Sequence, residues 1–282
     1  MSEALRSLLD RFDADAGWRR PAGWRERAQW QERIERLSLS LESGAAALRD
    51  RADAALARLD AADADAAAAV RARIVAGDGA RVLREWTSEP AAQADGEGYD
   101  PLDAMLGAVL ALNEPRGEIA APAPQTVFYQ PTPARHALDL LARLDLGAYD
   151  VLIDLGSGLG HVPLLAAACT PARCVGIEHE AAYVASAREC AQALRLRRVE
   201  FVHADARVAE LAAGTVFYLY TPFTGELLAQ VLERLRALSL RRPIRLASLG
   251  PCTQTLAAQP WLRPLQETWA PDRIAVFAAG AA

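Results

Sequence analysis

The 282-residue chain contains no lysine, only four cysteines and few aromatic residues, which make up 6% of the sequence. All 31 basic residues are therefore arginines. The cysteines lie in apolar segments without CxxC spacing, at Cys169, Cys174, Cys190 and Cys252. This arrangement predicts buried thiols rather than metal ligands or a redox pair, so we expect no metal site.

Long apolar runs are also missing. No stretch is long enough to span a bilayer, and the first residues, Met-Ser-Glu-Ala-Leu-Arg, lack the basic-then-apolar layout of a signal peptide. We therefore expect a cytoplasmic protein without membrane contact.

Negative charge is concentrated in the first part of the chain. Residues 1–120 hold 22 acidic side chains against 16 arginines, whereas the remainder holds 14 against 15. An acidic region beside a neutral one offers no basic surface to a phosphate backbone. The charge pattern thus argues against bulk nucleic-acid binding and leaves nucleic acid only as a small substrate region.

Residues 1–87 predict a helical appendage. Trp30, Ile34, Leu37 and Leu41 recur at helical spacing, and further stripes of leucine, alanine and valine continue to Ile74. Because much of the later stripe is alanine, we expect close packing on another helix. That helix is either a neighbour in an antiparallel hairpin or part of a second protomer, which would make the protein a homodimer through its N-terminal helices.

A linker with one helix is expected at residues 88–126. The helix covers residues 101–112, with a proline in its first turn. The following Tyr129-Gln-Pro-Thr-Pro cannot continue a helix, because its prolines lack N–H donors and restrict the residues before them. Thr132 is expected to cap a helix over 134–144.

Residues 127–282 predict an α/β domain in which strands and helices alternate. Strands are expected at 150–155, 173–178, 199–203, 215–220 and 244–249, and helices at 161–169, 181–194 and 225–238. Two final strand candidates, Leu262–Trp269 and Arg273–Ala278, would form an antiparallel hairpin. The pattern predicts a doubly wound, mostly parallel seven-stranded sheet with an antiparallel terminal hairpin.

The stretch most informative about function is Val151-Leu-Ile-Asp-Leu-Gly-Ser-Gly-Leu-Gly-His161. An apolar strand ends in Asp154 and leads through Gly156, Gly158 and Gly160 into an apolar helix. Glycines at such a turn let the backbone double back and let a ligand approach closely.

Acids stand at or just after three consecutive strand ends, where open parallel sheets bind ligands. Asp154 ends the first strand, and Glu178 ends the second at the position that accepts hydrogen bonds from ribose hydroxyls. Asp205 and Ala206 follow the third strand, where an acid can accept a hydrogen bond from the exocyclic amine of an adenine. Together with the glycine turn, these acids predict a nucleoside site.

A nicotinamide enzyme is the first alternative. Its GxGxxG fingerprint needs a third glycine at the place held by His161, and Asp154 would repel a pyrophosphate. S-adenosylmethionine carries an amino group and a sulfonium but no phosphate, so it fits the acid better.

From about Val127 to its end, the chain resembles the class I S-adenosylmethionine-dependent methyltransferases. Asp154-Leu-Gly-Ser-Gly-Leu-Gly is similar to that family's first motif, and the antiparallel terminal hairpin agrees with its inserted seventh strand. Together with the following Gly-Ile-Glu, the motif is similar to the non-SET histone lysine methyltransferases. Tyr129-Gln-Pro-Thr-Pro-Ala-Arg and Tyr220-Thr-Pro-Phe resemble a bacterial group distantly similar to those enzymes.

The resemblance implies how S-adenosylmethionine would be held. Asp154 and the glycine turn would bind its methionyl part, Glu178 its ribose, and Asp205 with Ala206 its adenine. The segment before the domain, with the end of the fourth strand, would close over the donor through Tyr129, Gln130, Thr132 and Tyr220.

The acceptor is left open as a small molecule or a protein. After the fourth strand, relatives that methylate amines carry Asn/Asp-Pro-Pro-Tyr/Phe or a pair of asparagines, whereas this chain has Tyr220-Thr-Pro-Phe. The candidate catalytic residues are Tyr129, Tyr220 and Phe223, of which Phe223 either stacks on a planar substrate or forms a pocket wall. Any proton removal would need a base, for which His161 and His203 are candidates and Tyr129 or Tyr220 weaker ones. A domain that binds a nucleoside without turnover is the second alternative function.

Overall fold

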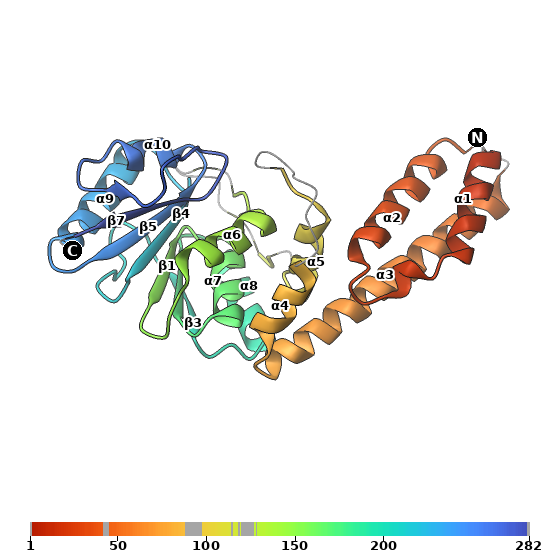
Figure 1. Ribbon diagram of the computed structural model, residues 1–282, viewed down its shortest axis with the longest axis horizontal. Helices are drawn as coiled ribbons and strands as arrows, with labels where there is room; N and C mark the ends of the chain where they lie inside the picture. The colour runs from red at the N-terminus through yellow and green to blue at the C-terminus, as the bar shows by residue number, and fades with distance from the viewer. Residues whose placement is uncertain are drawn as a thin grey trace.

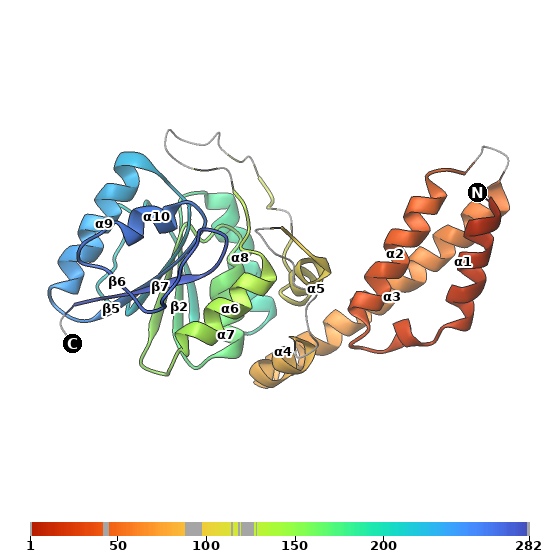
Figure 2. The ribbon, with the colours of Figure 1, turned by 45° about the horizontal axis from the view of Figure 1, so that its top comes forward.

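The computed structural model describes residues 2–41, 45–87, 98–113, 115–117, 119, 127 and 129–280. A helical arm extends away from an α/β domain that holds the C-terminus (Figure 1, Figure 2). The helices that precede the α/β domain are α1 (Ser2–Ala14), the 3-10 helix η1 (Gly17–Arg19), α2 (Trp24–Ser38), α3 (Ala46–Val75), α4 (Gly79–Thr87) and α5 (Pro101–Val109). The predicted helical character of residues 1–87 is confirmed for those that the structure describes. The helix that begins at Pro101 is confirmed as well, and it ends at Val109.

The arm, formed by α1, α2 and the first half of α3, has its own apolar core. Ile34, Ala52 and Leu59 of the predicted stripes are fully buried there, together with Leu5 and Phe12 of α1. The stripes therefore pack inside one chain, as in the antiparallel-hairpin alternative.

A buried arginine ties the arm together. The Arg27 guanidinium is fully buried and donates to the Asp63 carboxylate of α3 at 2.5 Å. It also donates to the carbonyl oxygens of Trp18 and Arg20, at 2.9 and 2.8 Å. One side chain of α2 thus links α3 to the turn that contains η1.

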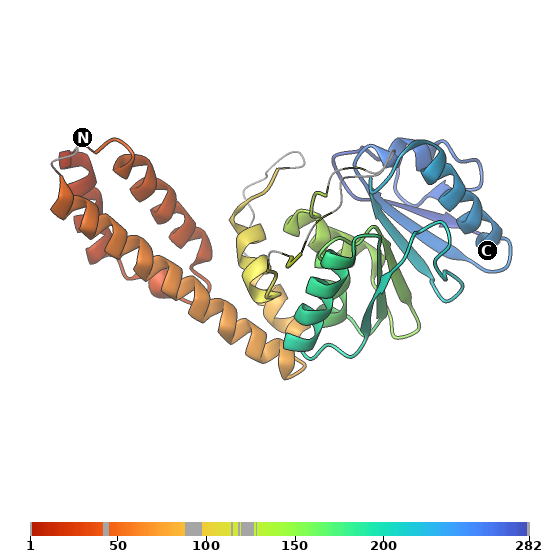
Figure 3. The same ribbon diagram turned by 180° about the vertical axis from the view of Figure 1, so that it is seen from behind.

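The far end of α3 merges with the α/β domain. Trp24, Val70, Ile74 and Val82 share one apolar cluster with the helices on one face of the sheet. Figure 3 shows the long helix α3 running from the arm to this contact. The core therefore continues across the residues that the sequence divides into appendage, linker and domain.

The domain contains the predicted seven-stranded sheet. Its strands are β1 (Val151–Leu155), β2 (Arg173–Glu178), β3 (Val199–His203), β4 (Val216–Tyr220), β5 (Ile244–Leu249), β6 (Arg263–Pro264) and β7 (Ala275–Ala279). They are ordered β3-β2-β1-β4-β5-β7-β6, and β7 runs antiparallel to both neighbours while the first five strands are parallel. The doubly wound fold with an antiparallel terminal hairpin is confirmed.

Helices cover both faces of the sheet. One face carries α6 (Ala134–Leu144), α7 (His161–Cys169) and α8 (Ala181–Ala193), and the other carries α9 (Gly225–Ser239) and α10 (Cys252–Ala257). Helix α10 was not expected from the sequence. Asp154 alternates with Ile153 and Leu155, which belong to the α9 face, so its side chain points to the α7 face.

The strand predicted over Leu262–Trp269 is much shorter than expected. Only Arg263 and Pro264 form β6. The Leu265 N–H still donates to the Val276 carbonyl at 2.9 Å, so the missing N–H of Pro264 is not what ends the ladder. The side chain of Gln266 replaces the strand beyond this point, since its amide oxygen accepts from the Val276 backbone N–H at 3.1 Å. An edge strand therefore ends after two residues.

The predicted cap at Thr132 is wrong. Pro133 is the N-cap of α6 and makes no side-chain cap bond, while the Thr132 hydroxyl faces Tyr218. The acceptor comes instead from α5, where Oδ1 of Asp103 accepts from the Ala134 backbone N–H at 2.7 Å. A residue 31 positions away thus performs the capping expected of a neighbour.

No described helix is both long and apolar enough to cross a membrane. Among the described residues, no group of three or more histidine, cysteine or acidic side chains is placed to hold a metal ion. All four cysteines are free thiols, three of them buried.

Candidate functional site

The fold brings the predicted strand-end residues to one edge of the sheet. Asp154, Glu178, His203 and Tyr220 lie at or beside the carboxyl ends of four neighbouring parallel strands, because β3, β2, β1 and β4 are adjacent in that order. This is the edge at which open α/β sheets bind ligands.

The glycine turn doubles back over β2. The backbone N–H groups of Gly156 and Ser157 both donate to the Ile177 carbonyl, at 2.8 and 3.0 Å. Gly158 has φ +52°, which favours glycine. A Cβ at Gly158 would lie 2.0 Å from the ring of Tyr129, so this aromatic side chain rests directly on the turn.

Asp154 is a buried carboxyl without a partner. Its side chain is 4% exposed, and it makes no hydrogen bond or ion pair within the described part of the chain. Burial raises the pKa of Asp154 well above its usual range, and the nearby charge of Glu178 raises it further. Such a group favours a cationic ligand, because a positive charge would offset both the burial and the neighbouring carboxylate.

Glu178 is held by backbone donors. Its Oε2 accepts from the Gly158 N–H and its Oε1 from the Glu180 N–H, both at 2.8 Å. Each carboxylate oxygen can accept a second bond. Glu178 is therefore fixed in position and retains acceptor capacity for ligand hydroxyls.

Asp205 is engaged by its own neighbour. Its carboxylate accepts from the Arg207 backbone N–H at 2.8 Å and forms an ion pair with the Arg207 guanidinium at 2.5 Å. This ion pair lowers the pKa of Asp205. Ala206 is buried beside it, with its carbonyl accepting from Arg234 at 2.9 Å. A ligand amine at Asp205 would share the carboxylate with Arg207.

A segment before α6 covers the turn. This strap, residues 127 and 129–133, is tied to β4 and its loop at two points. The Val127 N–H donates to the Pro222 carbonyl at 3.2 Å, and the hydroxyls of Thr132 and Tyr218 lie 3.0 Å apart. Gln130, between them, is exposed and makes no hydrogen bond with other described residues.

Tyr129 packs among polar and aromatic groups. Its ring centroid lies 4.9 Å from that of Tyr183 in α8, and its hydroxyl lies 3.3 Å from Nδ1 of His161. Burial lowers the pKa of His161 to about 4 and raises the pKa of the Tyr129 phenol far above its usual range. Both groups are therefore neutral at pH 7.

The loop after β4 is strained and mostly buried. Thr221 has φ +39°, a rare conformation for a β-branched residue, and its hydroxyl bonds the Leu249 carbonyl and the Cys252 N–H. Pro222 follows so closely over the turn that a Cβ on Gly156 would meet it at 2.3 Å. Phe223 is 5% exposed and packs in the cluster on the α9 face. His203 is exposed, with Nε2 2.9 Å from the His179 carbonyl.

Three residues of this arrangement were not among the predicted site residues. Tyr218 pairs with Asp154 in the strand register, Tyr183 packs against Tyr129 with its ring tilted, and Thr221 shapes the loop. The two-residue period of β4 could have found Tyr218, since it shares a face with Tyr220. No pattern in the sequence predicts the positive φ of Thr221.

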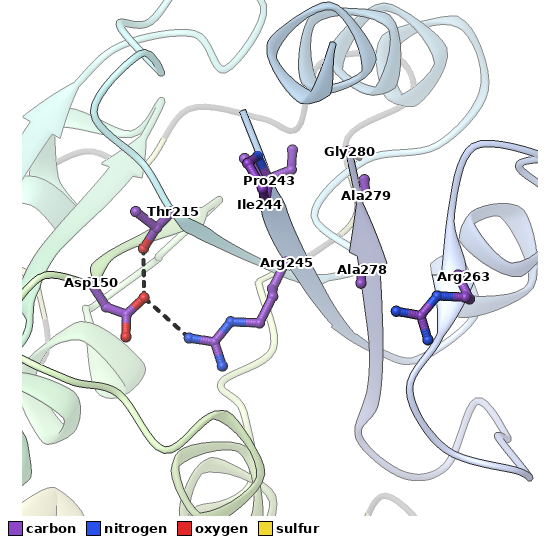
Figure 4. Close-up of a pocket in the computed structure, with 9 residues that line it drawn as sticks. All are labelled: Asp150, Thr215, Pro243, Ile244, Arg245, Arg263, Ala278, Ala279 and Gly280. Carbon is purple, nitrogen blue, oxygen red and sulfur yellow. Dashed lines mark hydrogen bonds and ion pairs between the residues drawn. The ribbon is translucent and has the colours of Figure 1, made fainter. Parts of the chain in front are cut away.

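A cavity of about 510 Å³ lies at the opposite edge of the sheet (Figure 4). It is lined by Arg245, Arg263 and the segment that precedes β1. Asp150 forms an ion pair with Arg245 at 3.1 Å and also accepts a hydrogen bond from the Thr215 hydroxyl. Because these residues stand where β1, β4 and β5 begin, the cavity is separate from the strand-end site.

Comparison with known proteins gives a family match over part of the site. Residues 126–212 match the family described as histone methylation protein DOT1. No curated protein matches the chain.

Solved structures of methyltransferases are similar to about half of the chain. An RNA methyltransferase from Salinibacter ruber, in complex with S-adenosyl-L-homocysteine, is 27% identical, with a TM-score of 0.40 over 53% of this chain and 92% of that one. A methyltransferase from Geobacter sulfurreducens is 20% identical, with a TM-score of 0.40 over 51% and 76%. The putative methyltransferase YhhF from Escherichia coli is 19% identical, with a TM-score of 0.45 over 56% and 92%.

The strand order, the antiparallel β7 and the DOT1 match agree with the first motif at Asp154–Gly160. The chain resembles the class I S-adenosylmethionine-dependent methyltransferases and, among them, the non-SET histone methyltransferases.

Proposed function

We propose that this protein transfers a methyl group from S-adenosylmethionine to an acceptor. The observation that carries the proposal is the unpartnered, buried Asp154 carboxyl beside the glycine turn and Glu178. Ser157 adds a second buried polar group, since its hydroxyl has no hydrogen-bond partner among the described residues. These residues fit a ligand that carries a cationic amino group and ribose hydroxyls.

The same geometry disfavours a dinucleotide. A pyrophosphate at the glycine turn would face the carboxyl of Asp154, which is already close enough to Glu178 to feel its charge. The antiparallel β7 between β5 and β6 also differs from the dinucleotide-binding sheet, whose strand order is 3-2-1-4-5-6. A nicotinamide oxidoreductase is therefore the weaker proposal.

When bound, the donor supplies an electrophilic methyl group on its sulfonium, and the protein supplies position and a dry surrounding. In this proposal Asp154 holds the donor amino group, Glu178 the ribose hydroxyls, and Asp205 with Ala206 the adenine. The turn of Gly156, Gly158 and Gly160 lets the backbone approach the ligand.

The strap would exclude water from the donor. Tyr129 already rests on the turn, and Thr132 is fastened to Tyr218 above Asp154. Gln130 is free to turn toward a ligand, and Tyr220 would border the transferred group from β4. Phe223 would serve as an apolar wall beneath that edge, since it is packed in the core.

Proton removal from the acceptor would not fall to a strong base at this site. His161 is neutral at pH 7, but its pKa of about 4 makes it a weak acceptor. Tyr129 is an even poorer base as a neutral phenol and would act as a hydrogen-bond donor to His161 or to a ligand.

Thermal shift assays with S-adenosylmethionine, S-adenosylhomocysteine and NAD⁺ test the proposal. At a ligand concentration of about 100 times the dissociation constant, the first two should stabilise the protein by about 2.7 kcal/mol, and NAD⁺ should not. Stabilisation by NAD⁺ alone would reject the proposal. Donor binding without methylation of any acceptor would instead favour the nucleoside-binding module.

A further inference from the structure

The carboxylate of Asp103 in α5 holds the N-termini of two helices. Its Oδ2 accepts from the Asp100 N–H and closes the capping box of α5, at 2.7 Å. Its Oδ1 accepts from the Ala134 N–H at the start of α6, also at 2.7 Å. The second bond joins α5 to the residue that directly follows the strap.

Tyr99 makes a second link from the same segment. Its hydroxyl donates to the Pro131 carbonyl of the strap at 2.9 Å. The segment that begins α5 therefore holds the strap at residue 131 and the start of α6 at residue 134, on both sides of Thr132. The loop after β4 and Tyr218 hold the strap from the sheet, so it is fastened between the helical region and the domain.

Helix capping alone accounts for only part of this arrangement. The bond from Asp100 to Asp103 stabilises α5, but the bonds to Ala134 and Pro131 add nothing to that helix. The bond to Ala134 caps α6, and the two bonds together flank Thr132 and Pro133, in a segment with two prolines and no regular hydrogen-bonded structure of its own. Without them, ordering the strap would add its entropic cost to donor binding.

We infer that Asp103 and Tyr99 are positioning residues that fix the strap, and with it Tyr129, over the donor site. The helical region is thus part of the donor-binding unit, and it contributes to donor affinity without touching the donor. This inference rests on the proposed function.

Calorimetric titration of the full-length chain with S-adenosylhomocysteine tests the inference. The Asp103→Ala variant should bind about tenfold more weakly, as expected for loss of a hydrogen bond to a charged group. Asp100→Ala is the matched control, because it removes the bond from the Leu102 N–H to Asp100 and leaves the contact with Ala134 intact. Its affinity should change by less than about twofold. The loss of affinity in Tyr99→Phe should lie between the losses in these two variants.

Hydrogen exchange of the ligand-free protein gives an independent readout. Asp103→Ala should accelerate amide exchange at the described strap residues and the first turn of α6, whereas Asp100→Ala should do so only in α5. If Asp103→Ala does not fold, Asp103→Asn and Asp100→Asn are compared in the same way, since the amide keeps one acceptor oxygen.

Equal effects of the Asp103 and Asp100 variants on affinity and on exchange would overturn the inference. If the unmodified protein does not bind S-adenosylhomocysteine, the proposed function fails. The exchange experiment still decides whether Asp103 positions the strap, so the two failures are distinguishable.

Discussion

Replacing Gly158 by alanine should displace the strap from the turn. A Cβ at this position would lie 2.0 Å from the Tyr129 ring, a distance that the ring can relieve only by moving away. The φ of +52° adds about 1–2 kcal/mol for a residue with a side chain. Losing the Tyr129–Tyr183 contact and the burial of the ring adds about 2 kcal/mol. The total loss of unfolding free energy is about 3–4 kcal/mol.

A double-mutant cycle separates the clash from the backbone strain. Tyr129→Ala alone should cost about 2 kcal/mol, because it removes the same ring contacts. Combined with Gly158→Ala, it should leave stability close to that of Gly158→Ala alone, so the cycle deviates from additivity by about 2 kcal/mol. Urea denaturation followed by circular dichroism measures all three variants.

Gly147→Ala is the matched control. A Cβ there would meet only the Asp150 carboxylate at 3.8 Å, and its φ lies outside the left-handed range, so the change should cost less than about 1 kcal/mol. Strict additivity of Gly158→Ala and Tyr129→Ala would refute the placement of Tyr129 on the turn.

Three further predictions concern charge and protonation. The pKa of His161 falls from about 6.5 in the unfolded chain to about 4 in the folded one, so its contribution to stability is present above pH 6.5 and is lost as the pH falls toward 4. In denaturation experiments, the unfolding free energy of His161→Gln should therefore fall by about 3 kcal/mol less than that of the unmodified protein between these pH values. Arg27→Met leaves Asp63 and three backbone carbonyls without their donor. Calorimetric unfolding should show a loss of about 3–5 kcal/mol in unfolding free energy, with the exposed Arg36→Met as an inert control. Arg207→Ala frees the Asp205 carboxylate and should raise donor affinity by up to about fivefold in calorimetric titration, whereas a large loss would contradict the adenine role of Asp205.

The fold could be predicted because the strands of the domain are short apolar runs separated by clear helical patterns. Each of the first five predicted strands matches an observed strand within one residue at either end. The prediction failed where a single side-chain contact decided the outcome. β6 ends after two residues, because the Val276 N–H donates to the side chain of Gln266 instead of to the backbone of the neighbouring strand.

The candidate site could be predicted where it depends on strand ends and glycines. Asp154 and Glu178 lie together because the parallel order of β1 and β2 requires it. The contacts of Thr132 could not be predicted, because a local capping rule competes with long-range partners that only the folded chain brings near. Tyr218 and Asp103 each lie far along the chain from the strap and from the start of α6.

The most direct test of the central claim is calorimetric titration of S-adenosylhomocysteine into Asp154→Asn. The amide preserves size but removes the negative charge that would hold the donor amino group, so affinity should fall by at least about tenfold. Asp150→Asn, at the opposite edge of the sheet, should bind like the unmodified protein. Unchanged affinity in Asp154→Asn would contradict the assignment of the donor site.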